Sequence, residues 1–245
     1  MIETESIFCA ENKDETSIPE LRKQAEKFEQ NGDVEKAIKI REQILLASEI
    51  KFGAKHLDVV PDLQKLAESY YKQNKLSKAE LFFQRILKIY EQKLKSQNGE
   101  VAYILNYLGL VYHKQTKYKE AELIMLRALK IREMQLEAED PNIAHNLNCL
   151  GSVYVDQNKY KEAAAFYKRA LKIFEQNNGA GTLGAGMVLI NQARLNEVQE
   201  KYKEAERLYQ QALTKYEKEL GLEHLDVASM LTSIAIFYEN QKKYS

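Results

Sequence analysis

A five-residue segment that recurs at a fixed interval sets the organisation of the whole chain. Lys-Tyr-Lys-Glu-Ala begins at residues 117, 159 and 201, which are 42 residues apart. The same interval relates six leucines and the small residue four positions after each of them. The leucines are Leu21, Leu63, Leu105, Leu147, Leu189 and Leu231, and the small residues are Ala25, Ala67, Gly109, Gly151, Ala193 and Ala235. A period of this length indicates a repeat protein, in which each unit stacks on its neighbours.

Each period contains two helical stripes that are separated by a short polar turn. One helix face is marked by the i, i+3, i+4, i+7 spacing of Leu147, Leu150, Gly151 and Tyr154. After the turn a second stripe follows, with Ala163, Tyr167, Ala170, Leu171 and Phe174. One pair of helices cannot bury such stripes alone, so antiparallel pairs are expected to stack around a continuous core. The glycines and alanines of the pattern let neighbouring helices approach closely.

This pattern of small, aromatic and alanine positions resembles the tetratricopeptide repeat (TPR), and the 42-residue period is similar to the kinesin light chain subtype. The resemblance rests on residues 142–144, 147–151, 154 and 159–163, and it extends over about residues 18 to 245. Leucine stands in all six phases where generic members often carry tryptophan, and the chain contains no tryptophan. The resemblance implies an all-α fold, a right-handed superhelical solenoid of antiparallel helix pairs.

Residues 1–16 fit no repeat phase and are rich in acidic side chains, so we expect a disordered lead-in there. Residues 17–245 are predicted to form a single solenoid of five helix pairs and one unpaired C-terminal helix, at about 225–241. The apolar stripe of that helix comprises Val227, Leu231, Ile234, Ala235 and Tyr238. We expect the natural chain to continue past Ser245 and cover this stripe. Self-association through the same helix is the alternative.

No cofactor is predicted. Residues 179–184 match the G-x-G-x-x-G dinucleotide pattern, but that motif requires a preceding strand, and here a repeat helix precedes it. We therefore expect an ordinary loop between repeats. The four glycines between Asn177 and Gly186 indicate a flexible connection with a late or frayed helix start.

No metal ligands and no catalytic residues are predicted, so we do not expect an enzyme. His56 and His224 occupy the same repeat phase, and no two histidines stand at ligand spacing on one helix. Cys9 and Cys149 form no disulfide framework, and no base held by a third group accompanies Cys149 in the pattern.

Charge and hydropathy limit the classes of partner. The 36 basic and 36 acidic side chains give zero net charge, which disfavours nucleic acid and anionic membranes. Most of the tyrosines fall at core phases, so a stacking platform for bases is not predicted. No run of 18 apolar residues could span a membrane. The acidic start argues against a secretory signal, which favours a cytoplasmic location.

In TPR-like arrays the first helix of each pair lines the concave face, so the resemblance implies a groove formed by residues beside the apolar stripe. Asparagine carries a donor and an acceptor, and a row of asparagines can pair with an extended peptide backbone. The expected groove residues are Gln64, Lys65, Lys72, Asn106, Tyr107, Leu110, His113, Lys114, Asn148, Ser152, Val155, Asn191 and Arg194. The function we expect is a protein–protein interaction scaffold that binds an extended segment of a partner.

Within this groove the asparagines are expected to hold the backbone, and Tyr107, Leu110 and Val155 to make apolar contacts. Lys72, Lys114 and Arg194 would attract acidic side chains. The groove positions become more acidic towards the C-terminus, which favours a short peptide with opposite charges at its two ends. The carboxylate clamp of chaperone-binding TPR domains is not matched. The alternatives are a self-associating structural module, a sensing or adaptor part of a larger protein, and a solvated face without a ligand.

Overall fold

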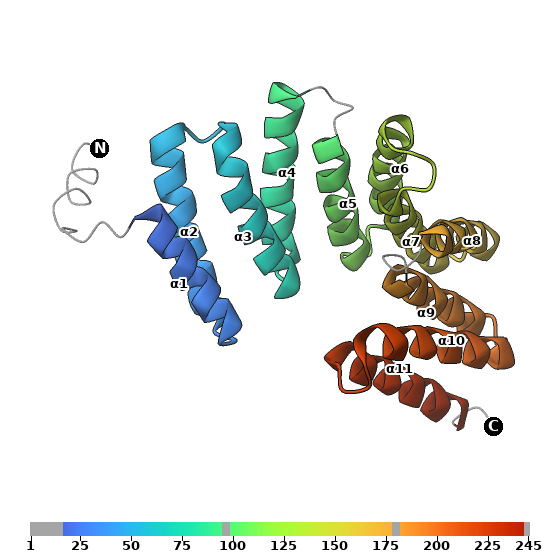
Figure 1. Cartoon of the computed structure of the whole chain (residues 1–245). Helices are drawn as coiled ribbons and strands as arrows, with labels where there is room; N and C mark the ends of the chain where they lie inside the picture. The colour runs from blue at the N-terminus through green and yellow to red at the C-terminus, as the bar shows by residue number, and fades with distance from the viewer. Residues whose placement is uncertain (1–16, 95–98, 178–181, 243–245) are drawn as a thin grey trace. The chain divides into compact units, whose positions relative to one another are not determined.

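The structure, a computed structural model, describes residues 17–94, 99–177 and 182–242. Over these residues every regular element is a helix, which confirms the all-α prediction (Figure 1). The elements are α1 (Ile18–Gln30), α2 (Val34–Phe52), η1 (Leu57–Val59), α3 (Val60–Lys72), α4 (Leu76–Lys93), α5 (Gly99–Lys114), α6 (Tyr118–Gln135), α7 (Pro141–Asp156), α8 (Tyr160–Gln176), α9 (Thr182–Val198), α10 (Tyr202–Leu220) and α11 (Leu225–Lys242). None of these helices is both long and apolar enough to cross a lipid bilayer.

Contacts divide the chain into two compact units, Met1–Lys95 and Ser96–Ser245. In the first unit α1 packs on α2 and α3 on α4, and in the second α5 packs on α6, α7 on α8 and α9 on α10. These are the consecutive helix pairs of the predicted repeats, with α11 following the last pair. One continuous solenoid over 17–245 stays a prediction, and the acidic lead-in at residues 1–16 lies outside the described residues.

The helices begin where the sequence signals place them. Ser17 and Glu20, in the S-x-x-E spacing of a capping box, form that box at the start of α1, where the Glu20 carboxylate accepts from the Ser17 backbone N–H at 3.0 Å. At the start of α7 the Asp140 carboxylate accepts from the backbone N–H of Asn142 at 2.7 Å. The two histidines that share a repeat phase also act as caps. His56 Nδ1 accepts from the backbone N–H of Asp58, and His224 Nδ1 accepts from that of Asp226.

One residue in each turn between paired helices has a left-handed backbone. These residues are Gly32, Asn74, Thr116, Asn158 and Glu200, with φ between 57° and 77°. The left-handed residue lets the following N–H reach back to the preceding helix, as in the bond from Lys159 N to Tyr154 O at 2.9 Å. The turn geometry therefore repeats with the 42-residue period, although the residue type at the turn varies.

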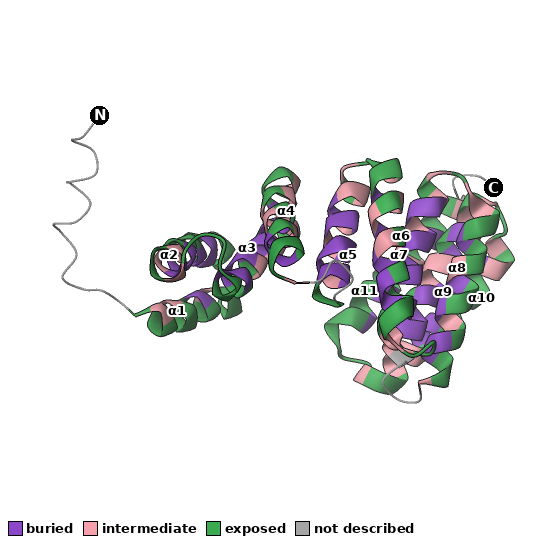
Figure 2. Cartoon of the chain, turned by 90° about the horizontal axis from the view of Figure 1, so that it is seen from above, coloured by how far each residue is buried: buried purple, intermediate pink, exposed green. Residues whose placement is uncertain are grey.

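The small residues of the repeat lie where two helices touch. A Cβ atom added to Gly109 would lie 2.5 Å from Cγ of Met125, and one added to Gly151 would overlap the ring of Tyr167. Both contacts join the first helix of a pair to the second, α5 to α6 and α7 to α8. The buried residues gather on the faces that neighbouring helices turn toward each other (Figure 2). Close approach at these glycines is the reason that the predicted helix pairs can form.

The glycine-rich stretch in the fifth repeat is helical from Thr182 onward, so the expected flexible connection does not extend to Gly186. Gly184 and Gly186 lie inside α9, where added Cβ atoms would meet the rings of Phe174 and Tyr216. These glycines make room for aromatic rings. Sequence reasoning took them for chain flexibility because the rings come from other helices.

Three of the five residues in the predicted stripe of α11, Leu231, Ala235 and Tyr238, are exposed. Val227 is buried together with Met230 and Phe237, whereas Leu231 is 48% exposed and Tyr238 41%. Tyr238 stands at a repeat phase that is buried in Tyr70 and Tyr154, so repeat phase alone does not determine burial in the last helix. In the earlier pairs the equivalent face packs against the second helix of the pair, and among the described residues no such helix follows α11.

Candidate functional site

Three of the predicted groove residues, Gln64, Lys65 and Lys72, lie on α3 in the first unit. Gln64 Nε2 donates to Glu68 Oε1 at 2.9 Å, and Lys65 Nζ lies 4.0 Å from the other oxygen of that carboxylate. Lys72 is exposed at the end of the helix. The structure thus places all three side chains on the surface of α3, and Glu68 partly neutralises the charge of Lys65.

A second carboxylate, Glu29 on α1, lies beside these lysines. The hydrogen bond from Arg41 holds the pKa of Glu29 below its usual range; burial opposes this shift, and the charges of Lys72 and Lys65 reinforce it. Arg41 Nη2 lies 2.8 Å from Glu29 Oε2. Because Glu29 and Glu68 offset Lys65 and Lys72, the first unit is less basic at this surface than the lysine count alone predicts.

The other predicted groove residues lie in the second unit. The three asparagines among them come from the first helices of successive pairs. Asn106 is on α5, Asn148 on α7 and Asn191 on α9. Asn191 Nδ2 donates to Asn148 Oδ1 at 2.9 Å, so these two amides are joined across neighbouring helices. Asn106 and Asn148 are 9% and 5% exposed. The asparagines therefore lie at the edge of the core, deeper than the sequence suggests.

Asn106 carries an unsatisfied group. Its Oδ1 is buried and has no hydrogen-bond partner among the described residues, while its amide lies against the thiol of Cys149. A buried acceptor without a partner costs about 1–3 kcal/mol.

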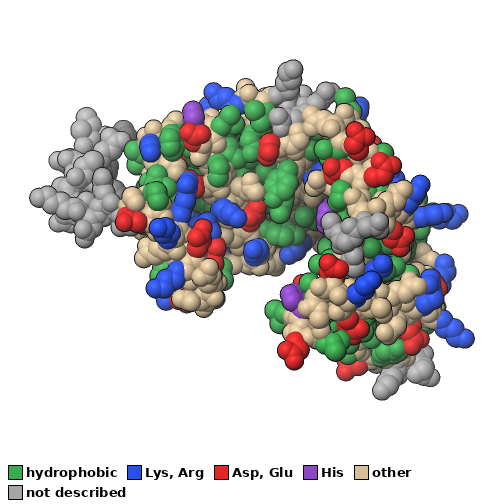
Figure 3. Space-filling model, in the orientation of Figure 1, with side chains coloured by type: hydrophobic (Ala, Val, Ile, Leu, Met, Phe, Trp, Pro, Cys, Tyr) green, Lys and Arg blue, Asp and Glu red, His purple; other side chains and the backbone are tan. Residues whose placement is uncertain are grey.

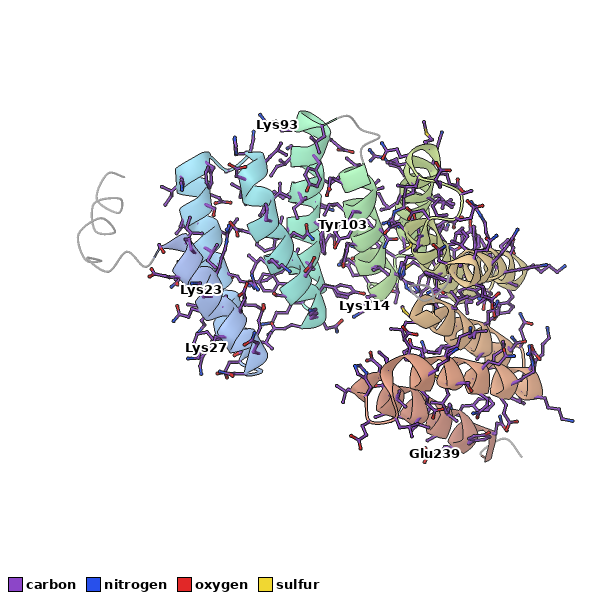
Figure 4. All side chains as sticks on the ribbon, viewed as in Figure 1. Lys23, Lys27, Lys93, Tyr103, Lys114 and Glu239 are labelled. Atoms are coloured by element: carbon purple, nitrogen blue, oxygen red, sulfur yellow. The ribbon has the colours of Figure 1, made fainter. Side chains whose placement is uncertain are left out.

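Two further predicted residues are engaged by neighbours within the second unit. His113 Nε2 on α5 lies 2.5 Å from Asp156 Oδ2 on α7, an interaction that joins two adjacent first helices. Ser152 bonds the hydroxyl of Tyr167 at 3.1 Å. Lys114 lies at the C-terminal end of α5, where it points away from the core (Figure 4). His113 and Ser152 are therefore positioned by contacts inside the array.

The predicted apolar residues are half-buried. Tyr107 packs against Tyr103 with ring centroids 4.9 Å apart, and both Leu110 and Val155 pack against the core of the second unit. Arg194 is exposed on α9, beside the hydroxyl of Tyr209. The predicted residues of the second unit thus lie along the first helices α5, α7 and α9, as expected.

Charged side chains of both signs alternate on the visible surface, and neither sign forms an extended patch there (Figure 3). In the second unit Lys114 marks the earlier end of the first-helix surface and Glu239 the last helix (Figure 4). The charge gradient along the first helices stays a prediction.

Groups that could perform chemistry are not assembled over the described part of the chain. Within it, no three His, Cys, Asp or Glu side chains gather in a way that could hold a metal ion. Burial raises the pKa of the Cys149 thiol to about 11, which leaves little of the reactive thiolate near neutral pH. Residues 179–181 of the G-x-G-x-x-G match lie outside the described residues, and Gly184 lies within α9.

Sequence reasoning missed one cavity, of about 750 Å³, at the end of the second unit. Its walls are the C-terminal part of α9, the turn into α10 and the C-terminal part of α11. It is lined by Glu197, Val198, Glu200, Tyr202, Phe237, Asn240 and Gln241. A comparison of residues two repeats apart could have revealed it. The side chains that meet between α5 and α7 are replaced by other residue types between α9 and α11.

Comparisons with known proteins agree with this architecture. The family model described as the tetratricopeptide repeat matches residues 21–92 and 100–176, and a second model with the same description matches residues 186–226. A comparison with curated protein sequences finds no significant match.

Three solved structures illustrate the fold. A crystal structure of the nearly identical TPR-like repeats of a putative kinesin light chain from Podosopora anserina has a TM-score of 0.68 and 18% identity, covering 82% of this chain and 95% of that one. BtubC (BKLC) from P. vanneervenii has a TM-score of 0.61 and 20% identity, with coverages of 89% and 83%. The apo form of RapI has a TM-score of 0.69 and 16% identity, with coverages of 93% and 84%.

At these identities the structures establish the fold, and one of them is named as a putative kinesin light chain, which agrees with the 42-residue period. The matched ranges of the family models cover most of the chain and contain the helix pairs described above. The chain belongs to the tetratricopeptide repeat family, with a kinesin light chain-like repeat.

Proposed function

We propose that the protein is an interaction scaffold that binds an extended peptide segment of a partner along the first helices of its second unit. The TPR fold indicates protein partners in general. The finer proposal, that a peptide lies across α5, α7 and α9, rests on the hydrogen-bonding groups along these helices. A cytoplasmic location and a non-enzymatic role remain the predictions of the sequence.

The observation that carries the proposal is the arrangement of the asparagine amides. The bond between Asn191 and Asn148 uses one donor and one acceptor, which leaves Asn148 Nδ2 and Asn191 Oδ1 without a hydrogen bond to any described residue. Asn106 Oδ1 also has no partner there. A donor on Asn148 and an acceptor on Asn191 therefore remain for the C=O and N–H groups of an extended backbone, and Asn106 Oδ1 offers a second acceptor if its side chain turns outward.

The neighbouring residues supply the remaining contacts of the proposed site. The half-buried Tyr107, Leu110 and Val155 offer apolar surface next to the amides, and Lys114 and Arg194 offer positive charge for acidic side chains. Gln64, Lys65 and Lys72 are proposed to serve in the same way on the first unit, where Glu29 and Glu68 reduce their net charge.

The experiment that tests this proposal needs no known partner. Random peptides of about 12 residues displayed on phage are selected against the full chain, and the affinity of the best synthetic peptide is measured by fluorescence anisotropy. The double variant Asn106→Ala, Asn148→Ala should weaken binding by about tenfold or more, since two hydrogen bonds of about 1 kcal/mol each are lost.

The matched control is Asn142→Ala, which removes an exposed amide at the start of α7. Circular dichroism melting separates loss of binding from loss of folding. If the double variant is folded and binds the selected peptide as tightly as the natural chain, the amide surface is not the binding site.

A second candidate is self-association through α11, which is favoured by the exposure of Leu231 (48%) and Ile236 (52%) on that helix. Light scattering over a wide range of concentration tests it. A chain that associates, and whose Leu231→Lys variant stays monomeric, would support this candidate, and a strict monomer at the highest concentration would remove it.

A further inference from the structure

The cavity at the end of the second unit has an uneven composition. Two carboxylates, Glu197 and Glu200, line it together with the rings of Tyr202 and Phe237, and no Lys or Arg does so among the side chains that the structure describes, which end at Gln241. Val198, a further wall residue, is 53% exposed. Such a cavity combines negative charge with apolar and aromatic walls, which suits the long apolar stem and charged end of a basic side chain.

The equivalent joint two repeats earlier, between α5 and α7, is closed by its own side chains. There His113 Nε2 meets Asp156 Oδ2. Gln157 Nε2 donates to the backbone oxygen of Tyr118 at 3.1 Å and to Glu122 Oε2 at 2.8 Å. The C-terminal end of α7 is thus held to α5 by an imidazole–carboxylate pair. It is held to the start of α6 by an amide that makes two hydrogen bonds.

At the last joint the residues at the same phase, 84 positions later, do not make these contacts. Glu197 stands at the position of His113, and Asn240 at the position of Asp156. Gln241 is the equivalent of Gln157, and its Nε2 is buried without a hydrogen-bond partner among the described residues. Among the side chains that the structure describes, Glu197 therefore has no ion-pair partner, and the Gln241 amide donor has no acceptor.

Neither Lys201 nor Arg194 forms an ion pair with the Glu197 carboxylate. Lys201 Nζ donates to Gln199 Oε1 at 2.6 Å, and Arg194 contacts the Tyr209 hydroxyl, the group that also bonds Glu197. The Tyr209 hydroxyl donates to Glu197 Oε1, which fixes one oxygen of this carboxylate and orients the other for an incoming donor. Glu200 is held at the mouth by the left-handed turn, at φ 60°.

We propose that this cavity receives the basic side chain of an arginine or lysine of the bound peptide. The guanidinium or ammonium group lies between Glu197 and Glu200, its stem packs on Phe237 and Val198, and Gln241 Nε2 donates to a peptide carbonyl. The partner cation then supplies the basic group that His113 supplies at the earlier joint. The inference rests on the proposed function, since it names the residue class that the peptide presents beyond the asparagines.

The test uses N-acetyl-L-arginine amide as the probe and the uniformly ¹⁵N-labelled full chain. On titration, the side-chain NH₂ signals of Gln241 and the backbone signal of Val198 should shift in a saturable manner. N-acetyl-L-norleucine amide, which has a similar stem without the charge, should not produce these shifts. The double variant Glu197→Gln, Glu200→Gln should raise the apparent Kd for the arginine probe by about fivefold or more.

A double variant on α8, Glu162→Gln with Glu175→Gln, is the matched control, because it makes the same change in net charge with side chains that do not line the cavity. It should leave the arginine titration unchanged. Equal shifts with norleucine, equal binding by the Glu197/Glu200 variant, or shifts confined to other residues would overturn the proposal.

The probe does not depend on the asparagines, so this outcome is separate from that of the proposed function. If the selected peptides require Asn106 and Asn148 but the arginine titration fails, only the cavity assignment falls. If arginine binds but the asparagines have no effect on peptide affinity, the cavity stands and the backbone site falls.

Discussion

The joint between α5 and α7 and the joint between α9 and α11 share the same repeat pattern but differ in what fills them. At the first, His113 meets Asp156, and Gln157 is bonded twice. At the second, Glu197 and Asn240 stand in the place of the pair, and the Gln241 donor has no partner among the described residues beside a cavity of about 750 Å³. Both joints keep the same helices. At the last joint, however, the side chains that bond each other in the earlier joint are replaced, and polar groups such as the Gln241 amide are left without a partner among the described residues.

The largest expected contrast concerns two equivalent cysteine positions in these joints. In a Cys9→Ser background, Cys149 should react slowly with iodoacetamide, since burial raises its pKa to about 11 and only about one thiol in a thousand is ionised at about pH 8. A cysteine placed by Ser233→Cys, with Cys149→Ser, lies 84 positions later on α11 and should react at least about thirtyfold faster. Mass spectrometry gives both rates, and equal rates would contradict the raised pKa of the Cys149 thiol.

The next contrast is between the two glutamines. Gln157→Ala should lower the free energy of unfolding by about 1–3 kcal/mol, because it leaves the Tyr118 carbonyl and Glu122 without their donor. Gln241→Ala removes an amide nitrogen that has no partner among the described residues and should change the stability by less than about 0.5 kcal/mol. Urea unfolding followed by circular dichroism measures both. A larger loss for Gln241→Ala would show that the last joint is closed.

The pair of residues that closes the earlier joint can be exchanged between the two places. Glu197→His with Asn240→Asp should rebuild the pair at the last joint and reduce affinity for N-acetyl-L-arginine amide by about fivefold. His113→Glu with Asp156→Asn should do the opposite and create arginine binding at the earlier joint. NMR titration with the arginine probe detects each change. If both double variants fold but arginine binding is unchanged at both joints, the two joints are not equivalent.

The smallest effect concerns pH. Burial, reinforced by the charge of Arg132, holds the pKa of His145 on α7 below its usual range. Since the unfolded chain then binds a proton more readily than the folded one, stability should be fully present above about pH 6.5 and decline as the pH falls through that value. His145→Gln should flatten this decline in urea unfolding between about pH 7.5 and pH 5.5. An identical slope in both proteins would exclude His145 as its source.

The sequence predicts the helix pairs, the turns and the close contacts well, because each depends on spacing within one repeat. Gly151 and its neighbours identify the packed face through the helix period. The capping box of Ser17 and Glu20 is local in the same way. All of the predicted groove residues of the second unit lie on the helices expected to carry them.

What the sequence could not reveal are contacts made between repeats. The bond from Asn191 to Asn148 and the pairing of His113 with Asp156 depend on how far neighbouring helices are apart. The burial of Gly184 under Phe174 was hidden for the same reason, and glycine was taken as a sign of flexibility. Exposure of Tyr238 differs from the periodic prediction because a helix face is buried only where another helix covers it.

The most direct test of the account is one NMR titration of the ¹⁵N-labelled chain with a selected peptide that contains a basic residue. Side-chain NH₂ signals of Asn148, Asn191 and Gln241 should shift on binding, and the signal of Gln157 should stay in place because both of its bonds are internal. Shifts that spare these three residues and lie instead on the second helices α6, α8 and α10 would contradict the account.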